Sequence, residues 1–201
     1  MRIVIATQNR GKQRELETML GPLGLDVSSM ADYPHIPDVV EDGETFSENA
    51  VKKARAVAGA TGEIALADDS GLEVDYLGGA PGVYSARFAG EAKDDQANNQ
   101  KLLGLLEGVP PEKRRARFKC VVAVALPGGP VYTAEGSCEG VIGTSPQGEG
   151  GFGYDPLFIV PDLGKTFAQL DMDIKNSISH RGKAFNMARE IISGLTAKEK
   201  K

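Results

Sequence analysis

Two neighbouring aspartates, Asp68 and Asp69, follow a short apolar run at residues 64–67 and are the first candidates for chemistry in the chain. Carboxylate oxygens are preferred ligands of hard cations such as Mg²⁺, and a positioned aspartate can take a proton from water. Either aspartate, with an acid from the pair Glu41 and Asp42, would supply two carboxylates. Adjacent strand residues point to opposite faces, so only one aspartate is expected to face a given cleft. The structural alternative is that both acids cap a turn after the strand.

A polar segment, residues 7–12, separates an apolar run from a helical pattern near the N-terminus. A loop that enters a helix presents backbone N–H groups, and Arg10 and Lys12 add positive charge, a combination that favours phosphate. Because Gln13 follows Lys12 and the first glycine is missing, the segment is not a P-loop. A plain connection with solvated charges is the alternative.

A glycine-rich loop, residues 148–153, carries Phe152 and leads into Tyr154 and Asp155. Its glycines have the spacing of a dinucleotide-binding motif, but a proline and a strand follow where that motif requires a helix, so we reject this interpretation. Phe152 offers an aromatic face for a base to stack on, or else fills the core beneath the loop. Residues 179–182 place a histidine and an arginine in the first turn of the last helix, where a serine cap and a solvated arginine are the alternative.

The elements that must position these residues are marked by short patterns. Thr45 with Glu48 three residues later predicts the start of a helix, which ends at Gly62. Residues 127–130, Pro-Gly-Gly-Pro, predict a hairpin turn and so an antiparallel portion. The remaining expected elements are strands at 3–6, 64–67, 72–76, 117–126, 131–137 and 157–160, a loop at 31–43, and helices after residue 12, from about residue 94, and near the C-terminus.

The composition is that of a globular protein, with 41% hydrophobic and 25% charged residues in a chain of 201. This length suits one domain or two lobes that share a sheet. The net charge of −5 disfavours nucleic acid and acidic membranes as partners. Two cysteines outside a CxxC pattern and two histidines cannot form a usual zinc cluster. No segment has the length of a signal peptide or a membrane span, so a soluble cytoplasmic protein is expected.

The order of six segments along the chain carries more information than any of them alone. They are residues 7–12, 45–54, 67–72, 79–87, 150–156 and 179–182. Together they resemble the inosine/xanthosine triphosphate pyrophosphatase family, and Phe-Gly-Tyr-Asp-Pro and Ser-His-Arg-Gly are the most specific of them. The resemblance implies an α/β fold with an elongated mixed β-sheet flanked by helices, in one domain, residues 1–201, of two lobes with a central cleft. Residues 197–201 are expected to be a flexible tail.

The resemblance also implies an activity: Mg²⁺-dependent hydrolysis of the deaminated purine nucleotides dITP, ITP and XTP to the monophosphate and pyrophosphate by a homodimer. Asp69 corresponds to the proton acceptor and a magnesium ligand, and Glu41 to the second ligand, with Asp42 as its alternative. The expected phosphate-binding residues are Thr7, Gln8, Asn9, Arg10, Gly11, Lys12, Lys52 and Ser70. The expected base-binding residues are Phe152, Gly153, Tyr154, Asp155, Lys175, His180 and Arg181.

Two other functions fit part of the pattern. A nucleotide sensor without catalysis would keep the cleft, although Asp69 beside a lysine-bearing loop argues against it. A pyrophosphatase acting on modified pyrimidines would share the architecture, although residues 179–182 disfavour it. Donors from Lys175, His180 or Arg181 would pair with the C6 oxygen of hypoxanthine and xanthine and oppose the amino group of adenine.

Overall fold

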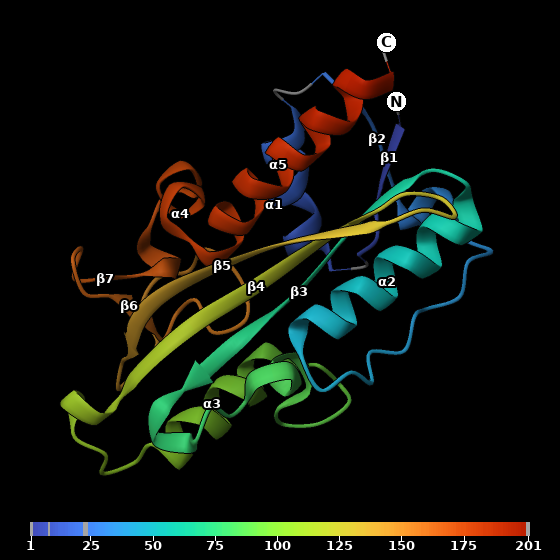
Figure 1. Cartoon of the computed structure of the whole chain (residues 1–201). Coiled ribbons are helices and arrows are strands. Elements are labelled where there is room, and N and C mark those ends of the chain that lie inside the picture. The colour runs from blue at the N-terminus through green and yellow to red at the C-terminus, as the bar shows by residue number, and fades with distance from the viewer. Residues whose placement is uncertain (1, 8, 22–23, 200–201) are drawn as a thin grey trace. The chain divides into compact units, whose positions relative to one another are not determined.

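The structure, a computed structural model, describes residues 2–7, 9–21 and 24–199. Gln8 of the expected phosphate loop lies outside these residues, and so does the side chain of Arg10. The strands are β1 (Arg2–Ile5), β2 (Asp26–Ser29), β3 (Ile64–Val74), β4 (Arg115–Ala125), β5 (Val131–Ile142), β6 (Phe158–Val160) and β7 (Lys165–Thr166). The α-helices are α1 (Arg10–Leu20), α2 (Phe46–Thr61), α3 (Asp95–Leu105), α4 (Met172–Ile178) and α5 (His180–Glu199) (Figure 1).

One mixed sheet contains all seven of these strands, in the order β2-β1-β3-β4-β5-β6-β7. Strand β1 pairs in parallel with both β2 and β3, whereas β6 pairs antiparallel with β5 and β7. The neighbours β4 and β5 are joined by a tight turn in which Gly129 N–H donates to the carbonyl of Leu126, as the Pro-Gly-Gly-Pro segment predicted. The expected mixed sheet flanked by helices is therefore confirmed.

The chain divides into two compact units. The first contains Met1–Asp69, Cys120–Gly136 and Arg181–Lys201, and the second contains Ser70–Lys119 and Ser137–His180. Each unit has its own hydrophobic core. The cleft expected from the resemblance stays a prediction.

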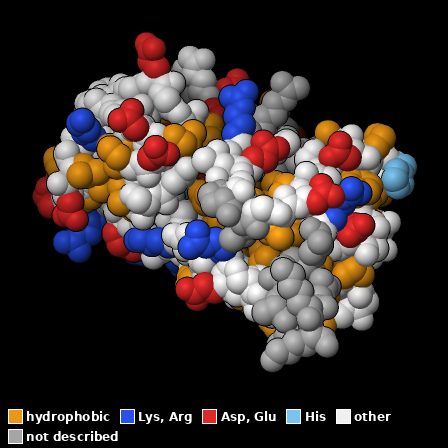
Figure 2. Space-filling view, turned by 90° about the horizontal axis from the view of Figure 1, so that it is seen from above, with side chains coloured by type: hydrophobic (Ala, Val, Ile, Leu, Met, Phe, Trp, Pro, Cys, Tyr) orange, Lys and Arg blue, Asp and Glu red, His pale blue; other side chains and the backbone are white. Residues whose placement is uncertain are grey.

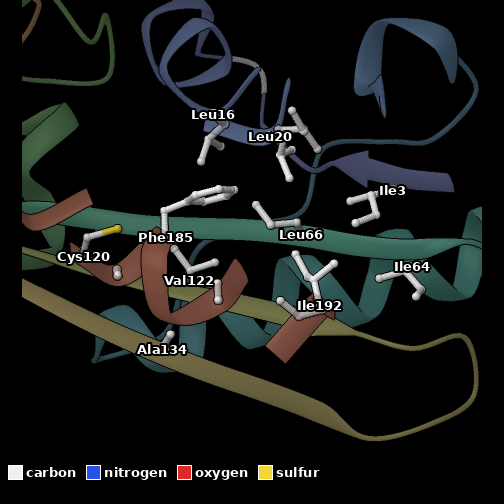
Figure 3. Packing of buried hydrophobic residues seen from close by; sticks show 14 residues of the cluster. Ile3, Leu16, Leu20, Ile64, Leu66, Cys120, Val122, Ala134, Phe185 and Ile192 are labelled. Carbon is white, nitrogen blue, oxygen red and sulfur yellow. The ribbon is translucent and has the colours of Figure 1, made fainter. Parts of the chain in front are cut away.

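The core of the first unit lies on one face of its strands (Figure 3). Ile3 on β1 and Leu66 on β3 pack with Leu16 of α1 and Phe185 of α5, all four with no exposed surface. Figure 1 shows α2 on the opposite side of β1 and β3. Small residues on the buried side of α2, among them Ala50, let this helix approach closely.

The core of the second unit is aromatic at its centre. Phe118 on β4 has its ring centroid 4.6 Å from that of Phe158 on β6 and 5.7 Å from that of Phe167. Leu102 and Leu106 come to the same core from α3 and its C-cap. These contacts anchor α3 to the sheet, which matters for the loop that α3 supports.

The largest difference from the sequence-based expectation concerns Asp68 and Asp69. They were expected at the end of a strand, before a turn, but β3 runs without a break from Ile64 to Val74 and both lie in its interior. Gly71 does not end the strand, and β3 continues through it beside β4. The interpretation of both aspartates as turn caps is therefore wrong.

Several short elements were not predicted. Strands β2 and β7 and helix α4 have too few apolar residues at regular spacing to stand out from the sequence. Helix α5 continues through Glu199, so residues 197–199 extend it by part of a turn. Flexibility of residues 197–201 stays a prediction.

No helix within the described part of the chain is both long and apolar enough to cross a membrane. Acidic and basic side chains are interspersed on the face drawn in Figure 2. This mixture agrees with a moderate net charge of −5.

Candidate active site

The polar segment after β1 forms the start of α1. Asn9 is the N-cap, and its Oδ1 accepts a hydrogen bond from the backbone N–H of Lys12 at 3.0 Å. The backbone N–H of Asn9 in turn donates to Oγ1 of Thr7 at 3.2 Å. Gly11 lies in the first turn of the helix. The side chains of Thr7 and Asn9 therefore order the loop, and the predicted entry into a helix is confirmed.

Lys12 points its ammonium group at Asp68. Its Nζ lies 3.1 Å from Asp68 Oδ2, and the carboxylate has no exposed surface. The same Oδ2 lies 3.3 Å from Nε of Arg181, whose Nη1 is bound by Glu15. Burial acts to raise the pKa of Asp68, but the charges of Lys12, Arg181 and Lys53 outweigh it and lower that pKa. Asp68 is thus an ionised member of a buried ion-pair network at neutral pH.

Asp69 points to the other face of β3 and has different neighbours. Its Oδ2 accepts a hydrogen bond from Nδ2 of Asn49 on α2 at 3.0 Å, and its Oδ1 lies 4.0 Å from Nζ of Lys53. Asp69 is 6% exposed, and this burial raises its pKa, against the effect of Lys12 and Lys53, with the charge of Glu41 adding to the rise. A carboxylate with a raised pKa is the stronger proton acceptor.

Lys53 links Asp69 to Glu41. Its Nζ donates to Glu41 Oε1 and to the backbone carbonyl of Asp68, both at 2.6 Å. Asp42, by contrast, pairs with the half-exposed Lys52. Of the two acids left open by the sequence, Glu41 is therefore the one beside Asp69. Lys52, expected near phosphate, has its ion pair with Asp42 and not with Glu41 or Asp69.

Lys53 was not among the expected site residues, although the sequence contained a signal for it. The buried face of α2 includes Phe46, Ala50 and Val57, and Lys53 falls on that face at helical spacing. A lysine on an apolar helix face requires an acidic partner, because a buried charge is costly when unpaired. Adjacent Lys52 is turned by about 100° around the helix, which explains its exposure.

The donor set fits a divalent cation that substrate oxygens complete. Within the described ranges, no group of three or more His, Cys, Asp and Glu side chains is arranged to hold a metal. Glu41 and Asp69 nevertheless supply two carboxylates around the ammonium of Lys53. Mg²⁺ is commonly bound through one or two carboxylates together with substrate phosphates. The fully buried thiol of Cys120 is no candidate nucleophile, because burial raises its pKa to about 12.

The second unit gathers most of the expected base-binding residues around the glycine-rich loop. Asp155 Oδ2 accepts hydrogen bonds from the backbone N–H of Phe152 at 2.9 Å and from Nζ of Lys175 at 2.7 Å. Gly151 has φ of +73°, and a Cβ there would overlap the Asp155 carboxylate. The glycine is therefore required for the carboxylate to fold back onto the loop.

Aromatic rings surround the buried ammonium of Lys175. Its Nζ lies 5.0 Å from the ring centroid of Phe152 and 5.7 Å from that of Phe167. His180 is 4% exposed and stacks on Phe118, with ring centroids 4.7 Å apart and planes inclined by 12°. Phe152 is only partly buried, so its ring retains an exposed surface.

Comparison with known proteins supplies the family. The sequence profile of the Ham1 family matches residues 3–191. The chain belongs to the Ham1 family. The dITP/XTP pyrophosphatase of Desulforamulus reducens is 64% identical over 195 residues, 97% of each chain. The dITP/XTP pyrophosphatase of Bacillus subtilis is 52% identical over 189 residues, 94% of this chain and 96% of the relative.

Solved Ham1 structures agree with the fold. The Ham1 protein of Staphylococcus aureus superposes with a TM-score of 0.86 at 42% identity, over 97% of this chain and all of the other. A HAM1 protein of Coxiella burnetii gives a TM-score of 0.87 at 41% identity, over 96% and 99% of the two chains. The family resemblance seen in the six sequence segments is confirmed.

The Ham1 chain brings the expected site residues together in two groups, one in each unit. We call Glu41, Asp69 and the additional Lys53 the carboxylate–lysine group. Lys12 lies beside Asp68, and its charge also acts on Asp69. The base-side group contains Phe152, Asp155, Lys175 and His180, with Gly153 and Tyr154 in the same loop. Ser70 follows Asp69 along β3. Arg181, expected in the base-side group, forms ion pairs with Glu15 and Asp68.

Proposed function

We propose that this Ham1 chain is a nucleoside triphosphate pyrophosphatase that converts dITP, ITP and XTP to their monophosphates and pyrophosphate, and so removes deaminated purines from the nucleotide pool. The observation that carries the proposal is the convergence of Glu41 and Asp69 on Lys53. Relatives of nearly equal length named dITP/XTP pyrophosphatase support the substrate class.

In the proposed reaction, water attacks the α-phosphorus of the triphosphate. Asp69 accepts the proton of this water on a carboxylate oxygen while the new P–O bond forms. The bond between the α-phosphorus and its bridging oxygen breaks, and its electron pair leaves with pyrophosphate. Asn49 fixes one oxygen of Asp69 by its 3.0 Å hydrogen bond, and Lys53 keeps a positive charge 4.0 Å from the other. General-base assistance of this kind contributes about 10²–10⁴-fold to the rate.

The departing pyrophosphate needs positive charge in an overall acidic protein. Lys12 and the backbone N–H groups in the first turn of α1 are the proposed contacts for the polyphosphate. The pKa of Lys12 is raised, because the nearby charge of Asp68 outweighs the opposing effect of burial, so the ammonium stays charged. Mg²⁺ held by Glu41, Asp69 and phosphate oxygens would neutralise further negative charge on the leaving group.

Base selectivity is assigned to the base-side group. The exposed surface of the Phe152 ring offers a stacking platform, and Lys175 and His180 are the proposed donors toward the C6 oxygen. Adenine carries an amino donor at that position, so ATP would place a donor against a donor. Sites that leave buried donors unpaired discriminate by about 10⁴-fold or more.

A substrate panel tests the proposal. Pyrophosphate release is measured from dITP, ITP, XTP, ATP, GTP and dUTP, with Mg²⁺ and with EDTA. We expect release from the three deaminated purine nucleotides, dependence on Mg²⁺, and slow release from ATP. Tight nucleotide binding without pyrophosphate release would favour the sensor. Release from pyrimidine nucleotides alone would favour the pyrimidine-specific alternative.

Two further properties belong to this proposal. The enzyme is proposed to act in the cytoplasm, where the nucleotide pool is used, and to form a homodimer. Analytical ultracentrifugation tests the second property directly, since a dimer has twice the mass of the 21.3 kDa chain.

A further inference from the structure

Helix α3 holds both backbone polar groups of Gly153. The N–H of Gly153 donates to Oδ2 of Asp95 at 2.7 Å, and its carbonyl accepts from Nδ2 of Asn99 at 2.9 Å. Asp95 and Asn99 are four positions apart on the helix, which places their side chains on the same face. The hydrogen bond to Asp95 is charge-assisted and so stronger than a hydrogen bond between two neutral amide groups. We call this pair of contacts the Gly153 clamp.

The clamp acts on the loop that carries Phe152. Gly153 has φ of +61° and lies between Phe152 and Tyr154. Before it, the N–H of Phe152 is bound by Asp155. After it, the hydroxyl of Tyr154 donates to the backbone carbonyl of Ser85 at 2.8 Å. A turn of the Gly153 peptide would redirect the Phe152 ring, and the clamp opposes this turn from both sides of the residue.

The helix is a firm support for the clamp. Asn98, next to the clamp, donates to the carbonyl of Ala86 and accepts from the N–H of Ala89. Leu102 fixes the following turn in the core with no exposed surface. Asn99 itself has a buried Oδ1 with no hydrogen-bond partner among the residues that the structure describes. The hydrogen bond of the Asn99 side chain to the loop is therefore made by Nδ2, which donates to the Gly153 carbonyl, and not by Oδ1.

We propose that Asp95 and Asn99 are positioning residues for recognition of the purine base. They hold the Phe152 ring in the orientation that receives the base. With the ring they hold the loop segment that binds Asp155, the partner of Lys175. This inference rests on the proposed function, because it assigns the same loop to base binding. Loss of the clamp weakens substrate binding while the carboxylate–lysine group keeps its own contacts, so KM changes more than kcat.

The test uses five variants of the full chain. Asp95→Ala and Asn99→Ala remove one contact each, and the double variant removes both. Asp95→Asn keeps an oxygen that can accept from Gly153 and is the conservative variant. Gln100→Ala is the matched control, since Gln100 is exposed on the same helix.

For the double variant we expect KM for ITP to rise about tenfold, which corresponds to about 1.4 kcal/mol of lost binding, with kcat within about twofold of wild type. Asp95→Asn and Gln100→Ala are expected to have nearly wild-type KM. An unchanged KM in an active double variant would overturn the inference alone. Absence of pyrophosphate release in the wild-type protein would overturn the proposed function, and the role in base binding with it.

Hydrogen exchange provides a readout independent of catalysis. The amide of Gly153 donates to Asp95, so Asp95→Ala is expected to speed its exchange at least about tenfold, whereas Gln100→Ala leaves it unchanged. Unchanged protection in Asp95→Ala would show that the clamp does not hold the loop. If the alanine variant at position 99 does not fold, Asn99→Leu keeps most of the side-chain volume and removes the donor.

Discussion

Replacement of Asp69 by asparagine separates the proposed proton transfer from the architecture around it. The two side chains have nearly the same shape, so Asn49 can still donate to an oxygen at position 69. Lys53 keeps its 2.6 Å hydrogen bonds to Glu41 and to the carbonyl of Asp68. What disappears is a negative charge and a proton acceptor.

The expected loss of activity follows from the role of a general base. Removal of such a group costs about 10²–10⁴ in kcat, which is about 2.7–5.4 kcal/mol of transition-state stabilisation. The free energy of unfolding, in contrast, should rise or stay unchanged in Asp69→Asn. The pKa of Asp69 is raised by burial, so folding disfavours its ionised form at neutral pH, and a neutral amide avoids this cost. Asp69→Asn is therefore expected to lose about 10²–10⁴ in kcat and to be at least as stable as wild type.

The assay pairs initial rates of pyrophosphate release from ITP with urea unfolding at pH 7. Asp26→Asn is the matched control, because Asp26 is an exposed carboxylate of the first unit that pairs with Arg2. A rate within tenfold of wild type in Asp69→Asn would refute its role as proton acceptor. A large loss of stability in that variant would refute the account of its burial.

Three other outcomes are expected. Asp68→Asn should lower the free energy of unfolding by about 3–5 kcal/mol, since Lys12 then loses its carboxylate partner and Arg181 keeps only Glu15. In wild type the pKa of Asp68 is lowered on folding, so its stabilising contribution should begin to fall as pH drops below about 4 and should be only partly lost at about pH 3. Urea titrations between about pH 3 and 7 measure both effects. Lys53→Met should raise the pKa of Asp69 further, so that the acidic limb of the kcat/KM profile moves to higher pH; an unmoved limb would contradict their coupling. Gly151→Ala should displace the Asp155 carboxylate and raise KM for ITP with little change in kcat; unchanged KM would count against this loop as the base site.

Local signals predicted the elements that local interactions form. Thr45 and Glu48 make the reciprocal capping box expected at the start of α2, and Gly62 ends that helix with φ of +71°. The prediction that the N-terminal polar segment enters a helix was correct for the same reason, because Asn9 caps α1 by a hydrogen bond to Lys12, three residues later. In such cases the atoms that decide the structure lie within four residues of one another.

Features that depend on distant partners could not be predicted. Strand β2, Asp-Val-Ser-Ser, is extended because it pairs with β1, and its own residues do not require it. Asp68 and Asp69 were predicted at the end of a strand, although β3 continues beside β4 to Val74. Arg181 pairs with Glu15, 166 positions away, and no residue spacing within either segment predicts that pair.

The alternation of Asp68 and Asp69 along β3 sets a limit on how this region can change. The two aspartates differ in environment because they lie on opposite faces of β3, so one inserted or deleted residue upstream in β3 would turn each side chain to the other face. Asp69 would then leave Asn49 and Lys53, and Asp68 would leave Lys12 and Arg181. A length change here is therefore expected to disturb both carboxylates at once, whereas a substitution disturbs one of them. Transfer of this pair of carboxylates to another scaffold therefore requires the strand to be moved as a whole, with the residues that pack on both of its faces.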